Sequence, residues 1–195
     1  MPWRWLLLIL IGYGSWHAWS GRAQSQPTGV IAANAPRQVP VERPVRLEKN
    51  GYSLEPLARF EVEARVLGKE QYSVDREAKL APVDLALGWG RMSDSAVLKK
   101  VSISQGNRFY YWRVDDFPIP QDEIVSSSGN MHMIPADAAI EKRLKAVRPG
   151  QVVSVSGYLV EASSQDGWRW RSSLSRTDTG FGACELVWVE DLSVR

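Results

Sequence analysis

The chain has 195 residues, and its 24 Lys and Arg residues nearly balance its 22 Asp and Glu residues, for a formal net charge of +2 at pH 7. So small a net charge produces no field that would recruit nucleic acid or acidic surfaces, and it leaves only local patches for electrostatic binding. Because Cys184 is the single cysteine, no intramolecular disulfide can form and the packed core must hold the fold.

Residues 1–23 have the layout of an export signal: Arg4 precedes an unbroken apolar run from Leu6 to Ile11. Tryptophans stand at both ends of this segment, where indole rings favour the lipid headgroup level, and this favours a retained signal anchor. Small residues before Gln24 suit a signal peptidase, so a cleaved signal peptide is the alternative. We expect a domain that faces the periplasm from the bacterial inner membrane, or one released into the periplasm after cleavage.

Residues 24–50 contain four prolines among small and charged residues and show no apolar periodicity. This composition is typical of an extended linker. We expect it to hold a single β-rich domain, residues 51–195, away from the membrane, since single domains most often have about 100–150 residues.

The first elements of the domain are predicted from alternation and turn residues. Residues 59–67 alternate apolar and charged side chains, which predicts a half-buried strand. A turn at residues 68–72 is expected to lead into a second strand near Val74. Gly106 and Asn107 tolerate a positive φ, so the segments on either side of them are predicted to form a hairpin.

The second half of the domain is predicted to contain one clear helix. Residues 136–147 place Ile140 and Leu144 at helical spacing, and Pro149 follows the helix. A shorter helix is expected after Ser93, which is a candidate N-cap. Residues 126–135 are expected to form a loop, whereas strands are predicted over 151–161, 168–173 and 183–192.

This order of elements resembles the oligonucleotide- and oligosaccharide-binding (OB) fold, a small curled barrel with a helix before its fourth strand. The fold class expected is therefore mainly β: an OB-like, curled antiparallel barrel with one or two short helices, behind an N-terminal hydrophobic helix. Residues 82–135 depart from the resemblance, because an ordinary barrel of this kind would have to hold them as an insertion.

A second resemblance rests on four short segments. They look like an uncharacterised bacterial family of exported or N-terminally anchored proteins, and they lie at residues 88–90, 107–113, 130–137 and 182–186. This resemblance implies export or anchoring and brings no activity with it.

Cys184 and His132 are the candidate catalytic pair, since a thiol nucleophile requires a base within hydrogen-bond reach. An unpaired cysteine at the start of an apolar strand most often packs as a small hydrophobe, so this pairing is the less favoured interpretation. His132 lies between two methionines, a combination that suits copper(I), but these three residues are too few for a metal site. We expect no metal and no cofactor.

Alternating Trp and Arg residues supply the best candidate binding site. The residues concerned are Trp168, Arg169, Trp170 and Arg171, with Arg113 and Arg176 as additional anion contacts. In a strand, both indoles lie on one face and both guanidiniums on the other. Indoles that face outward would stack on sugar rings or bases, although a place in the core is the favoured interpretation.

The sequence thus favours a noncatalytic binding or scaffolding module of the cell envelope. Its expected partners are the membrane, through the N-terminal segment, and an envelope protein or a cell-wall glycan, while export argues against nucleic acid. The alternatives are a cysteine-dependent enzyme that uses Cys184 and His132, and a subunit of a membrane complex.

Overall fold

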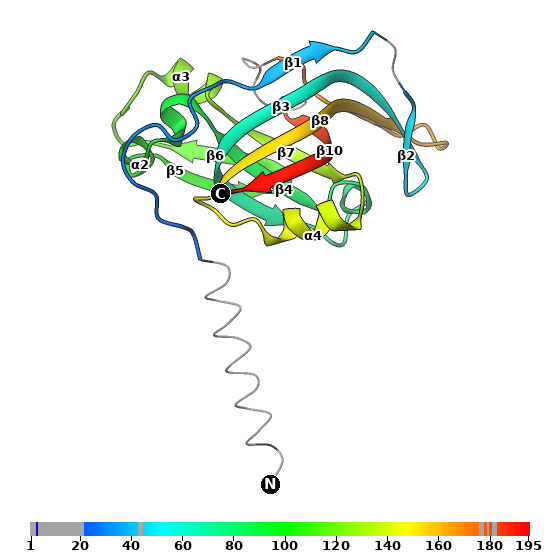
Figure 1. Ribbon diagram of the computed structural model, residues 1–195, viewed down its shortest axis with the longest axis horizontal. Helices are drawn as coiled ribbons and strands as arrows, with labels where there is room; N and C mark the ends of the chain where they lie inside the picture. The colour runs from blue at the N-terminus through cyan, green and yellow to red at the C-terminus, as the bar shows by residue number, and fades with distance from the viewer. Residues whose placement is uncertain (1–2, 4–21, 43–44, 176–177, 179, 181–182) are drawn as a thin grey trace.

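A computed structural model describes residues 3, 22–42, 45–175, 178, 180 and 183–195 (Figure 1). Almost all of the predicted leader, residues 1–23, lies outside these described residues. Within them, no helix has both the length and the apolar character needed to cross a bilayer.

Five strands close into a ring. In order around the ring they are β3 (Tyr52–Gln71), β4 (Val83–Gly88), β7 (Ser128–Pro135), β10 (Glu185–Val194) and β8 (Val152–Ser163). The long strand β3 pairs with β4 on one side and β8 on the other, which closes the ring. Strands make up 45% of the described residues and helices 16%, so the mainly β prediction is confirmed.

One pair of neighbours departs from the predicted antiparallel barrel, because β7 and β10 run parallel. Parallel neighbours require a long crossover connection. Here the crossover contains α4 (Ala138–Ala146), β8 and the short strand β9 (Arg169–Arg171), which pairs with β8.

Strand β3 shows how the core is built from alternating residues. Phe60, Val62 and Ala64 point into the ring, where they meet inward side chains of the other four strands, whereas Glu61 and Glu63 are exposed. The half-buried strand predicted at residues 59–67 is therefore confirmed.

The predicted turn at residues 68–72 is wrong, because β3 continues through Gly68 to Gln71. A bulge between Val66 and Gly68 changes the register instead of ending the strand. A Cβ at Gly68 would lie only 2.4 Å from Gln105 Oε1, so the missing side chain lets the neighbouring hairpin approach.

The predicted loop at residues 126–135 is also wrong, since β7 occupies most of it between β4 and β10. A strand covered on both faces shows no alternation of apolar and polar residues, so its periodicity gives no signal. Helix α3 (Gln121–Ser126), just before β7, was likewise not predicted.

The helix predicted at residues 136–147 is confirmed as α4, which buries Ile140 and Leu144 in the barrel core. Asp137 is its N-cap and accepts a hydrogen bond from the Ile140 amide at 2.8 Å. The short helix after Ser93 is α2 (Ser95–Leu98), but its N-cap is Asp94. With the 3-10 turns η1 (Glu77–Lys79) and η2 (Gly90–Ser93), the described helical elements exceed the one or two expected.

The segment predicted as a linker is extended but lies against the domain. Strand β1 (Arg37–Pro40) pairs with β3, and so does β2 (Leu47–Lys49). Ala32 is buried, and the Gln24 amide donates to the Pro149 carbonyl at 2.7 Å. The described residues between Gln24 and Lys49 therefore lie against the barrel.

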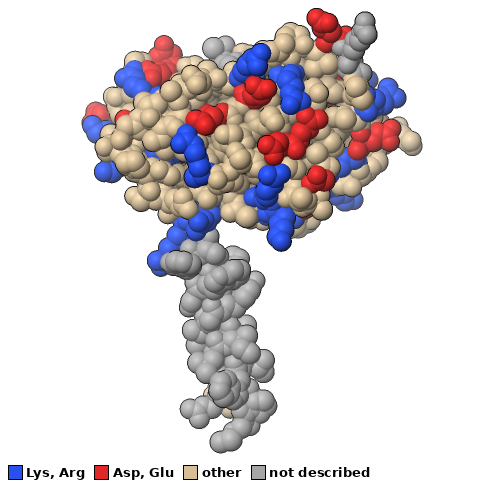
Figure 2. All heavy atoms as spheres, in the orientation of Figure 1, with Lys and Arg blue, Asp and Glu red and all other residues tan. Residues whose placement is uncertain are grey.

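The predicted hairpin is confirmed as β5 (Ser102–Gly106) and β6 (Phe109–Arg113). Its turn residues are Asn107 and Arg108, with φ of 53° and 70°, and not Gly106. The hairpin forms a separate small sheet beside the barrel (Figure 1). Acidic and basic side chains are interspersed over the face of the domain shown in Figure 2, in keeping with the small net charge.

Candidate binding site

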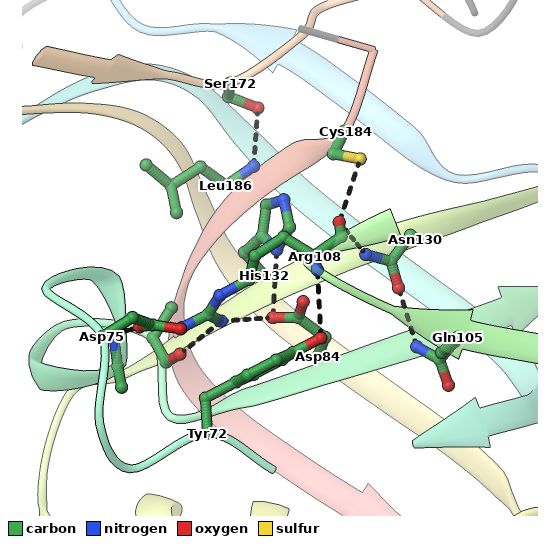
Figure 3. A network of polar contacts seen from close by, with 12 residues as sticks. Tyr72, Asp75, Asp84, Gln105, Arg108, Asn130, His132, Ser172, Cys184 and Leu186 are labelled. Carbon is green, nitrogen blue, oxygen red and sulfur yellow. Dashed lines mark hydrogen bonds and ion pairs between the residues drawn. The ribbon is translucent and has the colours of Figure 1, made fainter. Parts of the chain in front are cut away.

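The tip of the hairpin rests on charged residues of the barrel wall. Asp84 of β4 and His132 of β7 stand opposite each other in the strand register. Since Leu85, Met131 and Met133 point into the core, the alternation of the strands places Asp84 and His132 on the outer face. Both are nonetheless buried, because Arg108 covers them (Figure 3).

Arg108 is the centre of this polar cluster. Its Nη1 lies 2.9 Å from Asp84 Oδ1 and donates to the Ala81 carbonyl at 2.9 Å, while its Nη2 lies 2.8 Å from Asp75 Oδ1. Asp84 Oδ1 also lies 3.0 Å from His132 Nδ1. Side-chain exposure is 1% for Asp84 and 15% for Arg108, so this ion pair is screened from water.

Two aromatic rings complete the enclosure. The Tyr72 ring centroid lies 3.7 Å from Arg108 Cζ, and the Trp170 ring centroid lies 4.7 Å from that of His132. The Tyr72 hydroxyl accepts a hydrogen bond from the Arg108 amide at 3.1 Å, and burial raises the pKa of Tyr72. Among the described residues, Asp84 Oδ2 and Arg108 Nε are buried without a hydrogen-bond partner.

A pocket of about 290 Å³ lies beside this cluster. Its described lining includes five aromatic residues, Trp89, Phe109, Tyr110, Tyr111 and Trp112, and polar side chains that include Ser128, Asn130, Ser175, Asp178, Cys184 and Glu185. The rings offer flat apolar faces, and the amide, hydroxyl and carboxylate groups offer hydrogen bonds. An apolar wall with a few convergent polar groups is the usual chemistry of a small-ligand site.

The carbonyl of Arg108 joins the cluster to the pocket. It accepts hydrogen bonds from Asn130 Nδ2 at 3.0 Å and from Cys184 Sγ at 3.9 Å, and both donors line the pocket (Figure 3). Gln105 Nε2 in turn donates to Asn130 Oδ1 at 2.8 Å. The side chain of Arg108 therefore belongs to the cluster, and its backbone belongs to the pocket wall.

The structure places the predicted catalytic pair on the same outer face but gives the two side chains different partners. Cys184 donates to the Arg108 carbonyl, whereas His132 faces Asp84 and Trp170. Burial raises the pKa of Cys184 to about 12, and the negative charges of Glu185 and Asp84 add to the effect. The thiol is therefore neutral at pH 7, and its hydrogen bond goes to the Arg108 carbonyl and not to His132.

The raised pKa of Cys184 predicts a loss of stability at alkaline pH. Between pH 9, where an exposed thiol ionises, and about 12, the unfolded chain releases a proton that the folded chain keeps. The free energy of unfolding should then fall as pH rises through this interval. In urea titrations at pH 8 and pH 10.5, the Cys184→Ser variant should lose less stability than the wild type. Equal losses in both proteins would contradict this account.

The two indoles of the Trp-Arg segment are half-buried and face the barrel. Trp168 and Trp170 lie against a second apolar cluster on the outside of the barrel. Arg169 and Arg171 point to solvent, where both pair with Glu161.

The other two predicted binding residues lie elsewhere. Arg113 is exposed at the end of β6 away from the turn, and Arg176 lies outside the described residues. Of the five predicted binding residues that the structure describes, Trp170 is the one that contacts the polar cluster.

The predicted site residues did not include Asp84, Arg108 or Asn130. Asp84 had a signal, because it is the one charged residue in the apolar run at residues 82–87. The described residues contain no group of three or more His, Cys, Asp or Glu side chains placed to hold a metal ion.

Fold and pocket together define a small β-barrel protein with an aromatic cavity on its outer wall. No protein-family model, curated protein or solved structure matches the chain.

Proposed function

We propose that this protein is a noncatalytic binding module of the bacterial envelope that takes a cell-wall glycan in its aromatic pocket. The lining of that pocket carries the proposal, since it combines five aromatic residues with amide, hydroxyl and carboxylate groups. Sugar rings have apolar faces that stack on aromatic rings, and their hydroxyls both donate and accept hydrogen bonds.

The order of the elements and the position of the pocket both support an OB-like barrel. The ring has five strands, and α4 lies between the third strand, β7, and the fourth, β8. OB barrels bind oligonucleotides and oligosaccharides on the face of strands two and three, between the loops after strands one and four. Here Tyr72 comes from the first of these loops and Cys184 from the second, and both lie at the site.

The charges of the lining favour a sugar over a nucleic acid. Binding of nucleic acid draws most of its affinity from Lys and Arg contacts to phosphates. Asp178 and Glu185 are the charged side chains among the described lining residues, and they would repel phosphates. The predicted export of the domain points to the same partner.

A binding role also agrees with the state of Cys184. Nucleophilic catalysis requires a thiolate or an adjacent base. Burial keeps this thiol protonated, and its hydrogen bond goes to a backbone carbonyl.

The test is calorimetric titration of the detergent-solubilised full chain with N-acetylglucosamine tetramers and soluble peptidoglycan fragments. We expect saturable binding that the Tyr111→Ala variant weakens about 3- to 10-fold, because an aromatic contact is worth about 0.5–1.5 kcal/mol. Tyr111 is 55% exposed and lines the pocket, so its removal should leave the fold intact.

Tyr158→Ala is the matched control, since Tyr158 lies on β8 and does not line the pocket. It should bind glycan as the wild type does. Absence of glycan binding, or an oligonucleotide that binds the pocket more tightly than any glycan, would contradict the proposal. Recovery of a stoichiometric envelope-protein complex without glycan binding would favour scaffolding instead.

A further inference from the structure

The hairpin that forms one wall of the pocket contacts the barrel through groups of opposite chemistry at its two ends, and between these ends Gln105 and Tyr110 hydrogen-bond to Asn130 and Ser128 of β7. At its root, Ile103 and Trp112 pack against an apolar cluster that includes Met92 and Ile124. At its tip, Arg108 enters the polar cluster around Asp84. Water can replace the polar contacts of the tip, whereas exposing the apolar contacts of the root to water is unfavourable.

The tip attachment is the weaker one on physical grounds. Burial of an ion pair costs so much desolvation that the pair adds little net stability. Asp84 Oδ2 and Arg108 Nε lack hydrogen-bond partners among the described residues, and water would satisfy both if the tip lifted. Arg108 also holds a φ of 70°, which disfavours a residue other than glycine.

The root attachment would persist when the tip lifts. Its contacts are apolar, and exposing them to water would be unfavourable. Opening would therefore be a hinge movement about the root and not a release of the whole hairpin.

Movement of the tip must alter the pocket. The Arg108 carbonyl holds Asn130 and Cys184 of the pocket lining, and residues 109–112 of β6 form the adjoining wall. Lifting the tip would break both hydrogen bonds and draw Tyr110 of β6 away from Ser128 of β7, to which it is hydrogen-bonded. Cys184, which is now partly buried, would become open to solvent.

We propose that the β5–β6 hairpin is a hinged wall of the aromatic pocket, latched at its tip by the ion pair between Arg108 and Asp84, and that release of this latch admits the ligand. The admission of a glycan rests on the proposed function, whereas the latch itself does not.

The test uses Cys184, the only thiol in the chain, as the reporter. We would measure the rate at which Ellman's reagent modifies the native full-length protein at one fixed pH. Arg108→Met removes the ion pair and should raise this rate at least 10-fold with the circular dichroism spectrum unchanged. Arg108→Gly also removes the ion pair but relieves the positive φ of the closed hairpin, so it should raise the rate less than Arg108→Met does.

The matched control is Arg37→Met, because Arg37 also pairs with a carboxylate, that of Glu61, but on the exposed outer strand β1. In the Arg37→Met protein, Cys184 should react with Ellman's reagent at the wild-type rate. A folded Arg108→Met protein whose rate stays within twofold of the wild type would overturn the latch.

If the Arg108→Met protein does not fold, hydrogen exchange of the wild-type protein tests whether the tip opens locally. The Arg108 amide, which donates to Tyr72, should exchange at a rate that low urea concentrations do not change, as in local opening, while the Phe60 amide of β3 responds to urea. An Arg108 amide that exchanges only with Phe60 would overturn the proposal.

Measuring the modification of Cys184 in the presence of glycan distinguishes the latch from the proposed glycan binding. N-acetylglucosamine tetramers should slow the modification of Cys184 in the wild type. If no glycan binds but Arg108→Met still exposes the thiol, the proposed function fails and the latch stands.

Discussion

Replacement of Phe60 by alanine is expected to lower the free energy of unfolding by about 3–5 kcal/mol. Phe60 lies in the middle of β3 with 0% of its surface exposed, and it is among the largest fully buried side chains of the barrel. Its removal loses the transfer free energy of the ring and leaves a cavity that five mutually bonded strands cannot collapse to fill. Urea denaturation followed by tryptophan fluorescence would measure the change.

Phe117→Ala is the matched control, since it makes the same substitution at a side chain that is 55% exposed. Phe117 has one edge contact, with Trp112, at a centroid distance of 6.3 Å, so its loss should cost less than about 1 kcal/mol. Similar losses for the two variants would contradict the placement of Phe60 at the centre of the core.

Gly157→Ala should be equally severe, with a loss of about 3 kcal/mol or more and a fall in soluble yield. Gly157 of β8 stands between Phe60 of β3 and Val189 of β10. A Cβ at this position would lie 1.8 Å from the Trp188 carbonyl oxygen. That oxygen belongs to the backbone of a paired strand, so it cannot move away without disrupting the sheet. Thermal unfolding monitored by circular dichroism would measure the loss.

Gly106→Ala supplies the comparison, because a Cβ at Gly106 would have nothing within 4 Å. Its φ lies outside the left-handed region, so alanine is tolerated there. We expect a change within about 0.5 kcal/mol. A Gly157→Ala protein as stable as Gly106→Ala would show that β10 does not approach β8 as closely as described.

The close approach at Gly157 accompanies a bulge in β10 between Val189 and Asp191. The strand predicted over residues 151–161 is confirmed as β8 (Val152–Ser163). The position of a glycine within a strand suggests a bulge or a close backbone contact. Which neighbouring strand makes that contact depends on pairing, and pairing is not written in local periodicity.

The candidate site was less predictable than the fold because its residues come from distant parts of the chain. Arg108 lies 24 residues from Asp84, 22 from Asn130 and 76 from Cys184. Arg108 itself was visible only as part of an aromatic strand with a basic start. No pattern in a single segment indicates that this guanidinium folds back over β4.

The Trp-Arg segment shows what alternation can predict and what only tertiary packing decides. Alternation predicted that Trp168 and Trp170 share one face and that Arg169 and Arg171 share the other. Whether the indoles face the core or the solvent was decided by the docking of β9 on β8, which turns them onto the apolar cluster outside the barrel.

The sequence by itself determined the β-rich class, the strand through Phe60, the hairpin and helix α4, because periodicity, capping and turn chemistry act over a few neighbouring residues. Only the tertiary structure decided that β7 is a buried strand parallel to β10, that residues 24–42 lie on the domain, and that Arg108 joins a buried ion pair with Asp84 to the wall of an aromatic pocket. These features depend on contacts between segments far apart in the chain, such as the pairing of β3 with β8, whose register local patterns do not encode.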